Sequence, residues 1–462
     1  MQRREFIKCS IAGAGVFLVP SWPLGAFAQS SPENGEPHFF LQVVFPNGWD
    51  PSYLFDARPL EMTRQGIIQN YSGEEPKLWT GANGGTCLAT KAVAPLEAYR
   101  QRFSILNGVL MANGFAGHDQ NMNFLFTGSP FGGESFVPHL NRATHERATP
   151  LDALQSGFFF ASLTNTGATV PLTPGSAVTL LQKLKNMPPL SADNPLFSFV
   201  RSRFAARSQG SGRFSKGVKK MLSGYDEAPQ LAALLESMKI EAPSQSTSNA
   251  ESIASFMGLA REMFQHRVTK SVVLSISLQD AFLDTHLDAL AKEQPKMYPK
   301  VVDALMAVFK SLDAPFDEHR SFWDVTTVLV ASEFSRTMRQ TGLPIDATGT
   351  DHNPLSNMMF LGGKGIRGGH VVGASDRATA SAPISKAHLT FDRDSLSVMA
   401  QPFDFGTGKP INALPEEFKA SDYLTASSVA NTIYSLFGVK KELYRVTDRG
   451  GPAAPLLKTL LI

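Results

Sequence analysis

The sequence predicts an α/β fold in which helices sandwich a doubly wound, mostly parallel sheet. Strongly apolar runs recur along the chain, and helix-length stretches separate them. Continuous apolar runs are typical of parallel strands that are covered on both faces. Strands are expected at 38–46, 103–111, 270–278 and 326–334. Helices are expected at 250–267, 298–312 and 425–437.

The first 28 residues have the pattern of a twin-arginine signal peptide. Arg3 and Arg4 precede a weakly apolar run at 11–19, and Ala-Phe-Ala at 26–28 forms a small-residue cleavage site. This run is far shorter than the roughly 20 residues that span a bilayer, so no permanent membrane span is expected. We therefore predict that the twin-arginine translocase exports the folded protein to the periplasm or cell surface. A basic N-terminal arm is the alternative interpretation.

Charge and cysteine content narrow the functional classes. Lys and Arg number 43 and Asp and Glu number 41, and the predicted signal alone accounts for the net charge of +2. The mature chain, 29–462, is thus close to neutral, which does not favour binding to nucleic acid or to acidic membranes. Cys87 is the single cysteine after the signal, so no intrachain disulfide is expected. Prolines and basic amphipathic patches at 150–249 indicate a helical elaboration on the main domain.

Acidic and histidine residues follow several of the predicted strands. The carboxyl ends of parallel strands meet at one edge of a sheet, where α/β folds usually place their chemistry. Carboxylate and imidazole groups together suit one or two divalent ions: zinc, manganese, calcium or magnesium. So many like charges would also be costly without a cation. The candidate metal ligands are Asp50, Asp284, His286, Asp351 and His352, with Glu333 at the end of the fourth strand.

Most of these residues also have a structural interpretation. Asp50 could be a helix N-cap or turn residue, and 284–286 could be a capped loop. Glu333 could pair with Arg336; without that pair, Arg336 would be free to hold an anionic oxygen of a substrate. His370, in the glycine-rich return after the fourth strand, is a further candidate ligand.

In combination, these motifs resemble the bacterial, twin-arginine-exported family known as domain of unknown function 1501. That family belongs to the alkaline-phosphatase-like superfamily, together with sulfatases and cofactor-independent phosphoglycerate mutases. The resemblance implies that two metal ions bind a phosphate or sulfate ester and that a hydroxyl group attacks it in line. The matching segments are 48–50, 117–118, 127–128, 284–286, 332–336, 349–352, 362–373 and the closing helix to Gly438.

The same resemblance implies roles for individual residues. Asp50 matches the metal carboxylate of the first strand, and Asp351 and His352 match the late ligand pair. Asp284 and His286 match the middle ligands, although their spacing is tighter than usual. Glu333 has the strand-end place that often precedes or supplies a ligand.

One departure concerns the nucleophile. In the superfamily it lies about ten positions before the glycine of a Thr-Gly turn, which is Thr127-Gly128 in this chain. The corresponding position is His118, and Gly117 stands where the family usually has serine. His118 could ligate a metal or act as a nucleophile or acid/base.

The predicted function is that of an exported metal-dependent hydrolase acting on a small anionic substrate, a phosphate or sulfate ester. His118, Glu333 and Arg336 are its candidate catalytic residues. One alternative is a non-catalytic periplasmic binding or assembly protein that recognises an envelope partner. Another is a metal-loaded protein of a different enzyme class.

Overall fold

The structure is a computed structural model, and it describes a defined part of the chain. Both the predicted signal and most of the predicted elaboration at 150–249 lie outside the described residues. The described residues are 36–59, 74–111, 117–132, 135–143, 153–156, 169–171, 202, 237–238, 249–278, 281–337, 349–377, 398–411, 420–439, 445–447 and 450–462.

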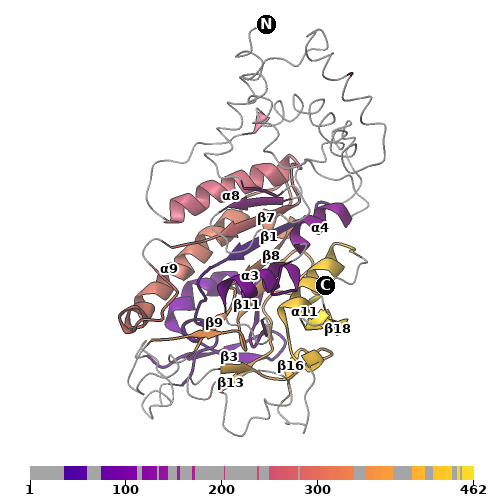
Figure 1. Ribbon diagram of the computed structural model, residues 1–462. Helices are drawn as coiled ribbons and strands as arrows, with labels where there is room; N and C mark the ends of the chain where they lie inside the picture. Colours follow the sequence, from indigo (N-terminus) through magenta and orange to yellow (C-terminus); the bar gives the residue numbers. More distant parts are fainter. Residues whose placement is uncertain are drawn as a thin grey trace, which may run out of the picture.

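An eight-stranded sheet lies at the centre of the described part. Its strands are β1 (Phe39–Val44), β4 (Phe103–Leu106), β5 (Ala153–Ser156), β6 (Thr169–Pro171), β7 (Ser271–Ser275), β8 (Thr326–Ala331), β11 (Met359–Gly363) and β12 (Val371–Val372). They are ordered β12-β4-β11-β8-β1-β7-β5-β6. Figure 1 labels the four central strands of this order, β11, β8, β1 and β7. β11 is antiparallel to β4 and β8, and the other pairs are parallel. The predicted α/β fold with a mostly parallel sheet is confirmed.

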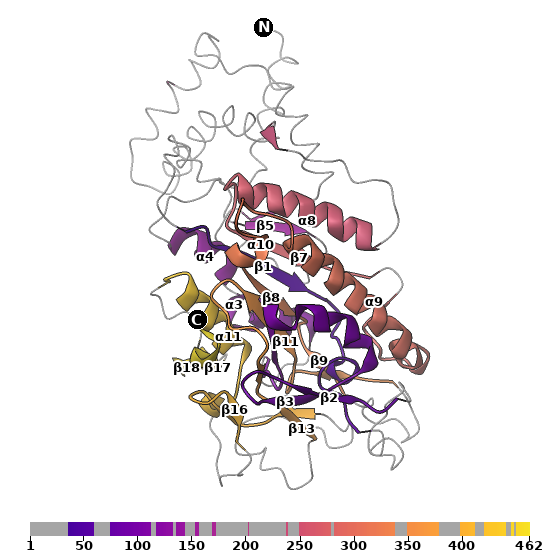
Figure 2. The ribbon, with the colours of Figure 1, turned by 180° about the vertical axis from the view of Figure 1, so that it is seen from behind.

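Helices cover both faces of this sheet (Figures 1 and 2). Because successive strand residues point to opposite faces, β1 contributes to two cores. The helices are α3 (His118–Thr127), α4 (Phe136–Ala143), α8 (Asn249–Gln265), α9 (Asp288–Leu312), α10 (Phe322–Val325) and α11 (Ala426–Leu436). Phe39, Leu41 and Val43 pack with α8 and α9, while Phe40 and Val44 pack with α3, α4 and α11.

Several element boundaries differ from the predictions. Helix α9 begins ten residues before the predicted 298, because it accommodates Pro295 and Pro299 within its length. The second predicted strand is shorter than expected, since Gly108 has φ +68° and turns the chain after β4. Residues 153–156 and 169–171, within the segment predicted as a helical elaboration, form strands β5 and β6 of the sheet.

The closing helix matches its prediction well. Thr425 is its N-cap, and the Thr425 side chain accepts a hydrogen bond from the backbone N–H of Ser428. Gly438 follows the helix with φ +67°, as expected for the residue that ends a helix. Within the described ranges, no helix combines the length and apolar character needed to cross a membrane.

Five two-stranded sheets and four 3₁₀ helices complete the described structure around the central sheet. The paired strands are β2 (Lys77–Thr80) with β3 (Thr86–Ala89), β9 (Ser335–Arg336) with β10 (His352–Asn353), β13 (Ser375–Arg377) with β14 (Val398–Ala400), β15 (Phe403–Asp404) with β16 (Lys409–Pro410), and β17 (Arg445–Thr447) with β18 (Gly450–Ala453). Among the 3₁₀ helices are Pro51–Tyr53, Lys91–Arg102 and Lys458–Leu460.

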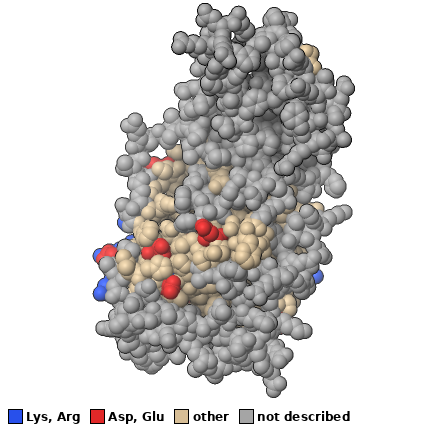
Figure 3. All heavy atoms as spheres, viewed as in Figure 1, with Lys and Arg blue, Asp and Glu red and all other residues tan. Residues whose placement is uncertain are grey.

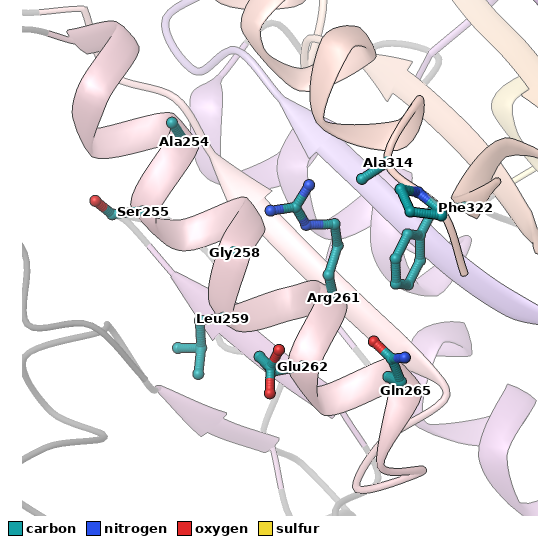
Figure 4. Close-up of a pocket in the computed structure, with 10 residues that line it drawn as sticks. Ala254, Ser255, Gly258, Leu259, Arg261, Glu262, Gln265, Ala314 and Phe322 are labelled. Atoms are coloured by element: carbon teal, nitrogen blue, oxygen red, sulfur yellow. The ribbon is translucent and has the colours of Figure 1, made fainter. Parts of the chain in front are cut away.

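A pocket of about 490 Å³ lies beside α8 (Figure 4). Its lining comes from α8, including Arg261 and Gln265, and from the segment around Ala314 and Phe322. Helix α8 leads into β7 and Phe322 leads into β8, so the pocket lies toward the edge where these strands begin. None of the predicted site residues lines it.

Candidate metal-binding site

The turn after β1 brings its backbone against the end of β8. Asn47 and Gly48 both have left-handed backbone conformations, with φ of 84° and 73°. A Cβ added at Gly48 would lie 2.1 Å from Cε2 of Phe334, so this close approach requires glycine. The turn directs the N–H of Asn47 to Oε1 of Glu333 at 2.7 Å.

Glu333 is fully buried and contacts His118. Its Oε1 lies 2.8 Å from Nδ1 of His118, and its Oε2 accepts a hydrogen bond from Oγ of Ser332 at 2.9 Å. His118 is the first residue of α3, which ends at Thr127 with Gly128 at φ +68°. The predicted Thr-Gly turn is therefore the end of the helix that His118 begins. With Nδ1 directed at Glu333, the Nε2 atom of His118 faces outward into the site.

Asp284 lies at the centre of the candidate site. Its Oδ2 is 3.6 Å from Nε2 of His118, while its Oδ1 is 3.1 Å from Nε2 of His286 and 3.6 Å from Nε2 of His352. Oδ1 also accepts a hydrogen bond from Nη2 of Arg336 at 2.7 Å. Burial opposes ionisation of Asp284, but His118, His352 and Arg336 outweigh it and hold the pKa of this carboxyl well below its usual range.

His352 lies among the other two histidines. Its Nε2 is 2.9 Å from Nε2 of His286. Its ring stacks on Phe334 with centroids 4.4 Å apart and lies edge-on to the ring of His118, also at 4.4 Å. Strand β10 carries His352 and pairs with β9, so that His352 lies opposite Arg336. The stacking and the strand pairing together fix the orientation of this imidazole.

Asp351 completes a second group of potential ligands. Its Oδ1 is 3.7 Å from Nδ1 of His286 and accepts a hydrogen bond from the backbone N–H of His352 at 2.8 Å. Two sets of three donors within 4.8 Å of one another result, both containing His352: one with His118 and Asp284, the other with His286 and Asp351. Imidazole nitrogens and carboxylate oxygens at these spacings fit a divalent metal ion.

The pKa values of two histidines respond differently to this environment. Burial alone would lower the pKa of His118, but hydrogen bonds to Asp284 and Glu333 outweigh it and raise that pKa to about 9. Burial and the nearby charge of Arg336 lower the pKa of His286. A cluster in which three imidazoles share carboxylates has strongly coupled charges, as expected where a cation can bind.

Two predicted residues have other contacts in this structure. Arg336 pairs with Asp284 rather than with Glu333, and its side chain is fully buried. Asp50 is the N-cap of the 3₁₀ helix Pro51–Tyr53, and its Oδ1 accepts hydrogen bonds from the backbone and hydroxyl of Ser52 at 2.9 and 2.6 Å. Burial raises the pKa of Asp50 to about 6. Neither Asp50 nor His370 belongs to the donor groups found among the described residues.

Sequence reasoning missed three neighbouring polar residues: Thr285, Thr350 and Gln294. Their side chains connect Arg336 to helix α9 inside the protein. The two threonines directly adjoin the predicted ligands Asp284 and Asp351 in sequence, which was the available signal.

Figure 3 shows acidic residues toward the middle of the described part of one face, with basic residues toward its margins.

Comparisons with known proteins identify the family. A search of curated proteins finds no match. The lipoteichoic acid synthase LtaP from Listeria monocytogenes is similar in structure, with 8% identity, coverage of 94% of this chain and 80% of that chain, and a TM-score of 0.34. For the zinc complex of the C-terminal periplasmic domain of EptC from Escherichia coli, the identity is 7%, the coverages 72% and 75%, and the TM-score 0.31. For the PsFucS1 sulfatase from Pseudoalteromonas sp., the identity is 10%, the match covers 80% of this chain and 68% of that chain, and the TM-score is 0.28. The model of the family described as protein of unknown function (DUF1501) matches residues 109–396, and this chain therefore belongs to that family.

Proposed function

We propose that this protein is an exported, metal-dependent hydrolase of phosphate or sulfate esters. The observation that carries the proposal is the position of Asp284, whose two carboxylate oxygens lie 3.1–3.6 Å from the Nε2 atoms of three histidines. A cation bound among these ionisable groups would explain why the fold brings so many of them together.

The donor spacing favours a small ion that accepts nitrogen ligands. Ligand atoms at about 2.0–2.1 Å from a tetrahedral zinc ion lie about 3.3 Å from one another. The spacings around Asp284, and the 2.9 Å between His286 and His352, lie close to this value. Calcium and magnesium prefer oxygen ligands, and calcium takes more of them at longer distances. Of the four ions expected from the sequence, we favour zinc, with manganese next.

Each residue then has a defined task. His118, Asp284 and His352 hold the ion, and Glu333 accepts the Nδ1 proton of His118 so that Nε2 is available as a ligand. When bound, the ion would polarise an ester oxygen as a Lewis acid. Asp351 serves the second group with His286 and His352.

This assignment makes His118 a metal ligand rather than a nucleophile. Its Nδ1 already contacts a buried carboxylate, and its Nε2 faces Asp284 at 3.6 Å. The sequence has Gly117 and His118 where the resemblance places the hydroxyl group, so a side-chain nucleophile has no counterpart at these positions. The missing hydroxyl also favours the second candidate function, a non-catalytic periplasmic binding or assembly protein that keeps the metal.

Export and partners belong to the same proposal. We infer passage through the twin-arginine translocase from Arg3, Arg4 and the cleavage motif at 26–28. An anionic ester or an envelope partner would then be met in the periplasm or at the cell surface.

The test begins with elemental analysis of chelator-free protein, comparing wild type with Asp284→Asn. Asp317→Asn is the matched control, because Asp317 is an acidic residue that pairs with Arg320 and belongs to neither donor group. We expect near-stoichiometric zinc in wild type and in the control, and its loss in Asp284→Asn.

The metal-loaded protein is then assayed with aryl phosphate and aryl sulfate esters. Turnover that disappears in Asp284→Asn supports the hydrolase. Stoichiometric metal without turnover of either ester class would support the binding protein instead. Wild-type protein that binds none of the four ions would refute both.

A further inference from the structure

We propose that Arg336 is a positioning residue for the metal ligand Asp284. We further propose that a buried relay formed by Thr350, Thr285 and Gln294 holds its guanidinium group in place. The proposal rests on the metal site described above and assigns Arg336 a role other than contact with substrate.

The contacts form a continuous chain from helix α9 to the ligand. Nε2 of Gln294 donates to Oγ1 of Thr285 at 2.7 Å, and Oγ1 of Thr285 lies 2.8 Å from Oγ1 of Thr350. Nε of Arg336 donates to Oγ1 of Thr350 at 3.0 Å, and its Nη2 donates to Asp284 at 2.7 Å. Four hydrogen bonds thus connect the amide on α9 to the carboxylate at the metal site.

One assignment of protons satisfies both threonine hydroxyls of the relay. Thr285 accepts from Gln294 and donates its hydroxyl proton to Thr350. Thr350 accepts from Thr285 and from Arg336, and donates its own proton to the backbone carbonyl of Thr285 at 3.1 Å. Thr350 is therefore oriented as an acceptor toward the guanidinium group, because both of its neighbours determine where its proton lies.

Burial makes this arrangement rigid. Thr285, Gln294, Arg336 and Thr350 are each at most 3% exposed. Nη1 of Arg336 has no hydrogen-bond partner among the described residues, so Nε and Nη2 provide the hydrogen bonds that hold the group. A planar guanidinium group held at two nitrogens has a fixed orientation, and it therefore fixes the carboxylate that it contacts.

The location of Arg336 couples two of the proposed ligands. Arg336 lies opposite His352 in the β9–β10 pair, and its side chain reaches Asp284 in the loop after β7. The backbone N–H of Thr350 also donates to the carbonyl of Thr285 at 2.9 Å, which joins the same two loops. A change in the relay should therefore shift Asp284 relative to His352 without removing a ligand. Partners of metal ligands commonly change metal affinity by about 10–100-fold when they are lost.

The test compares Thr350→Val, which removes the hydroxyl and keeps the shape, with Thr350→Ser, which keeps the hydroxyl. Thr327→Val is the matched control, since Thr327 is a buried threonine whose Oγ1 bonds to His38 and to the carbonyl of Lys364. Zinc affinity is measured by chelator competition, the ligand geometry by the visible absorption of the cobalt-loaded protein, and thermal stability without metal by calorimetry.

We expect Thr350→Val to weaken zinc binding about 10–100-fold and to change the cobalt spectrum. Thr350→Ser should restore both properties. Thr327→Val should lose thermal stability while binding zinc like the wild type. If Thr350→Val does not fold, Gln294→Met removes the first donor of the relay, and a smaller change in the same direction is expected.

Two outcomes would overturn the inference in different ways. If wild type binds zinc and the folded relay variant has unchanged affinity and cobalt spectrum, the relay does not position Arg336 for Asp284, and the proposed metal site stands. If wild type binds neither zinc nor cobalt, the proposed metal site fails, and the role of Arg336 fails with it.

Discussion

Replacing Glu333 with glutamine removes a charge while keeping the shape of a buried side chain. In the native structure, Oε1 accepts from the backbone N–H of Asn47 and from His118, and Oε2 accepts from Ser332. Glutamine can keep the first two bonds through its carbonyl oxygen. Its amide nitrogen can donate to Ser332, whose hydroxyl proton can be given to the carbonyl of Phe45 at 2.6 Å. Every hydrogen-bonding group therefore retains a partner.

The two measurable effects should consequently differ in size. Exchanging a charged for a neutral hydrogen-bond acceptor should change the free energy of unfolding by about 1 kcal/mol without metal. In the proposed metal site, however, His118 would lose the carboxylate that makes Nε2 a stronger ligand. Loss of such a partner should weaken metal binding about 10–100-fold, which corresponds to about 1.4–2.7 kcal/mol.

Zinc affinity measured by chelator competition tests this expectation. Glu262→Gln is the matched control, because Oε2 of Glu262 on α8 lies 3.6 Å from Nε2 of His266 and Glu262 belongs to neither donor group. The control should bind zinc like the wild type. An affinity of Glu333→Gln within twofold of wild type, or an equal loss in the control, would refute the role given to Glu333.

Further predictions concern the turn, a buried histidine and metal removal. Gly48→Ala should lower the free energy of unfolding, measured in urea, by about 2–4 kcal/mol, because the new Cβ would lie 2.1 Å from Phe334 and the backbone is left-handed. Gly258→Ala is the control: its Cβ would have no atom within 4 Å, so the free energy of unfolding should be unchanged or higher. Burial, with smaller effects of nearby lysines, lowers the pKa of His38 to about 3. As the pH falls below about 6.5, the unfolded state therefore binds the proton first, and the free energy of unfolding should fall by up to about 1.4 kcal/mol per pH unit. A His38→Gln variant whose stability has the same pH dependence would contradict this. Removing zinc with a chelator should lower the free energy of unfolding of the wild type by about 2.7 kcal/mol, compared with protein in zinc at 100 times its Kd. The same treatment should leave the stability of Asp284→Asn unchanged. Equal losses in the two proteins, measured by calorimetry, would place the ion elsewhere.

Local patterns in the sequence determined the main elements of the fold and the loops that carry the candidate site. The four apolar runs correspond to β1, β4, β7 and β8, because burial on both faces requires continuous apolar residues. The donors Asp284, His286, Asp351 and His352 were predicted as one cluster, since they follow strand ends that share an edge of the sheet. Capping residues likewise marked the limits of α11.

The details of pairing depended on the tertiary structure. Glu333 and Arg336 are close in sequence, but Glu333 lies at a bend after β8 and Arg336 lies on β9, and each has a distant partner. Glu333 contacts His118, which is 215 positions away, and Arg336 contacts Asp284, 52 positions away. Local propensity contains no information about such contacts.

The same distinction separates the candidate ligands from the buried polar residues next to them. Asp50 was predicted as a ligand, and in the fold its carboxylate also accepts a hydrogen bond from the backbone N–H of Ser52 as an N-cap. Thr285, Thr350 and Gln294 have ordinary residue types and acquire significance because the fold buries them together. The sequence by itself determined which chemical groups reach this edge of the sheet. Only the packing of distant segments decided which groups face one another, because burial forces each polar atom to find a partner wherever the fold provides one.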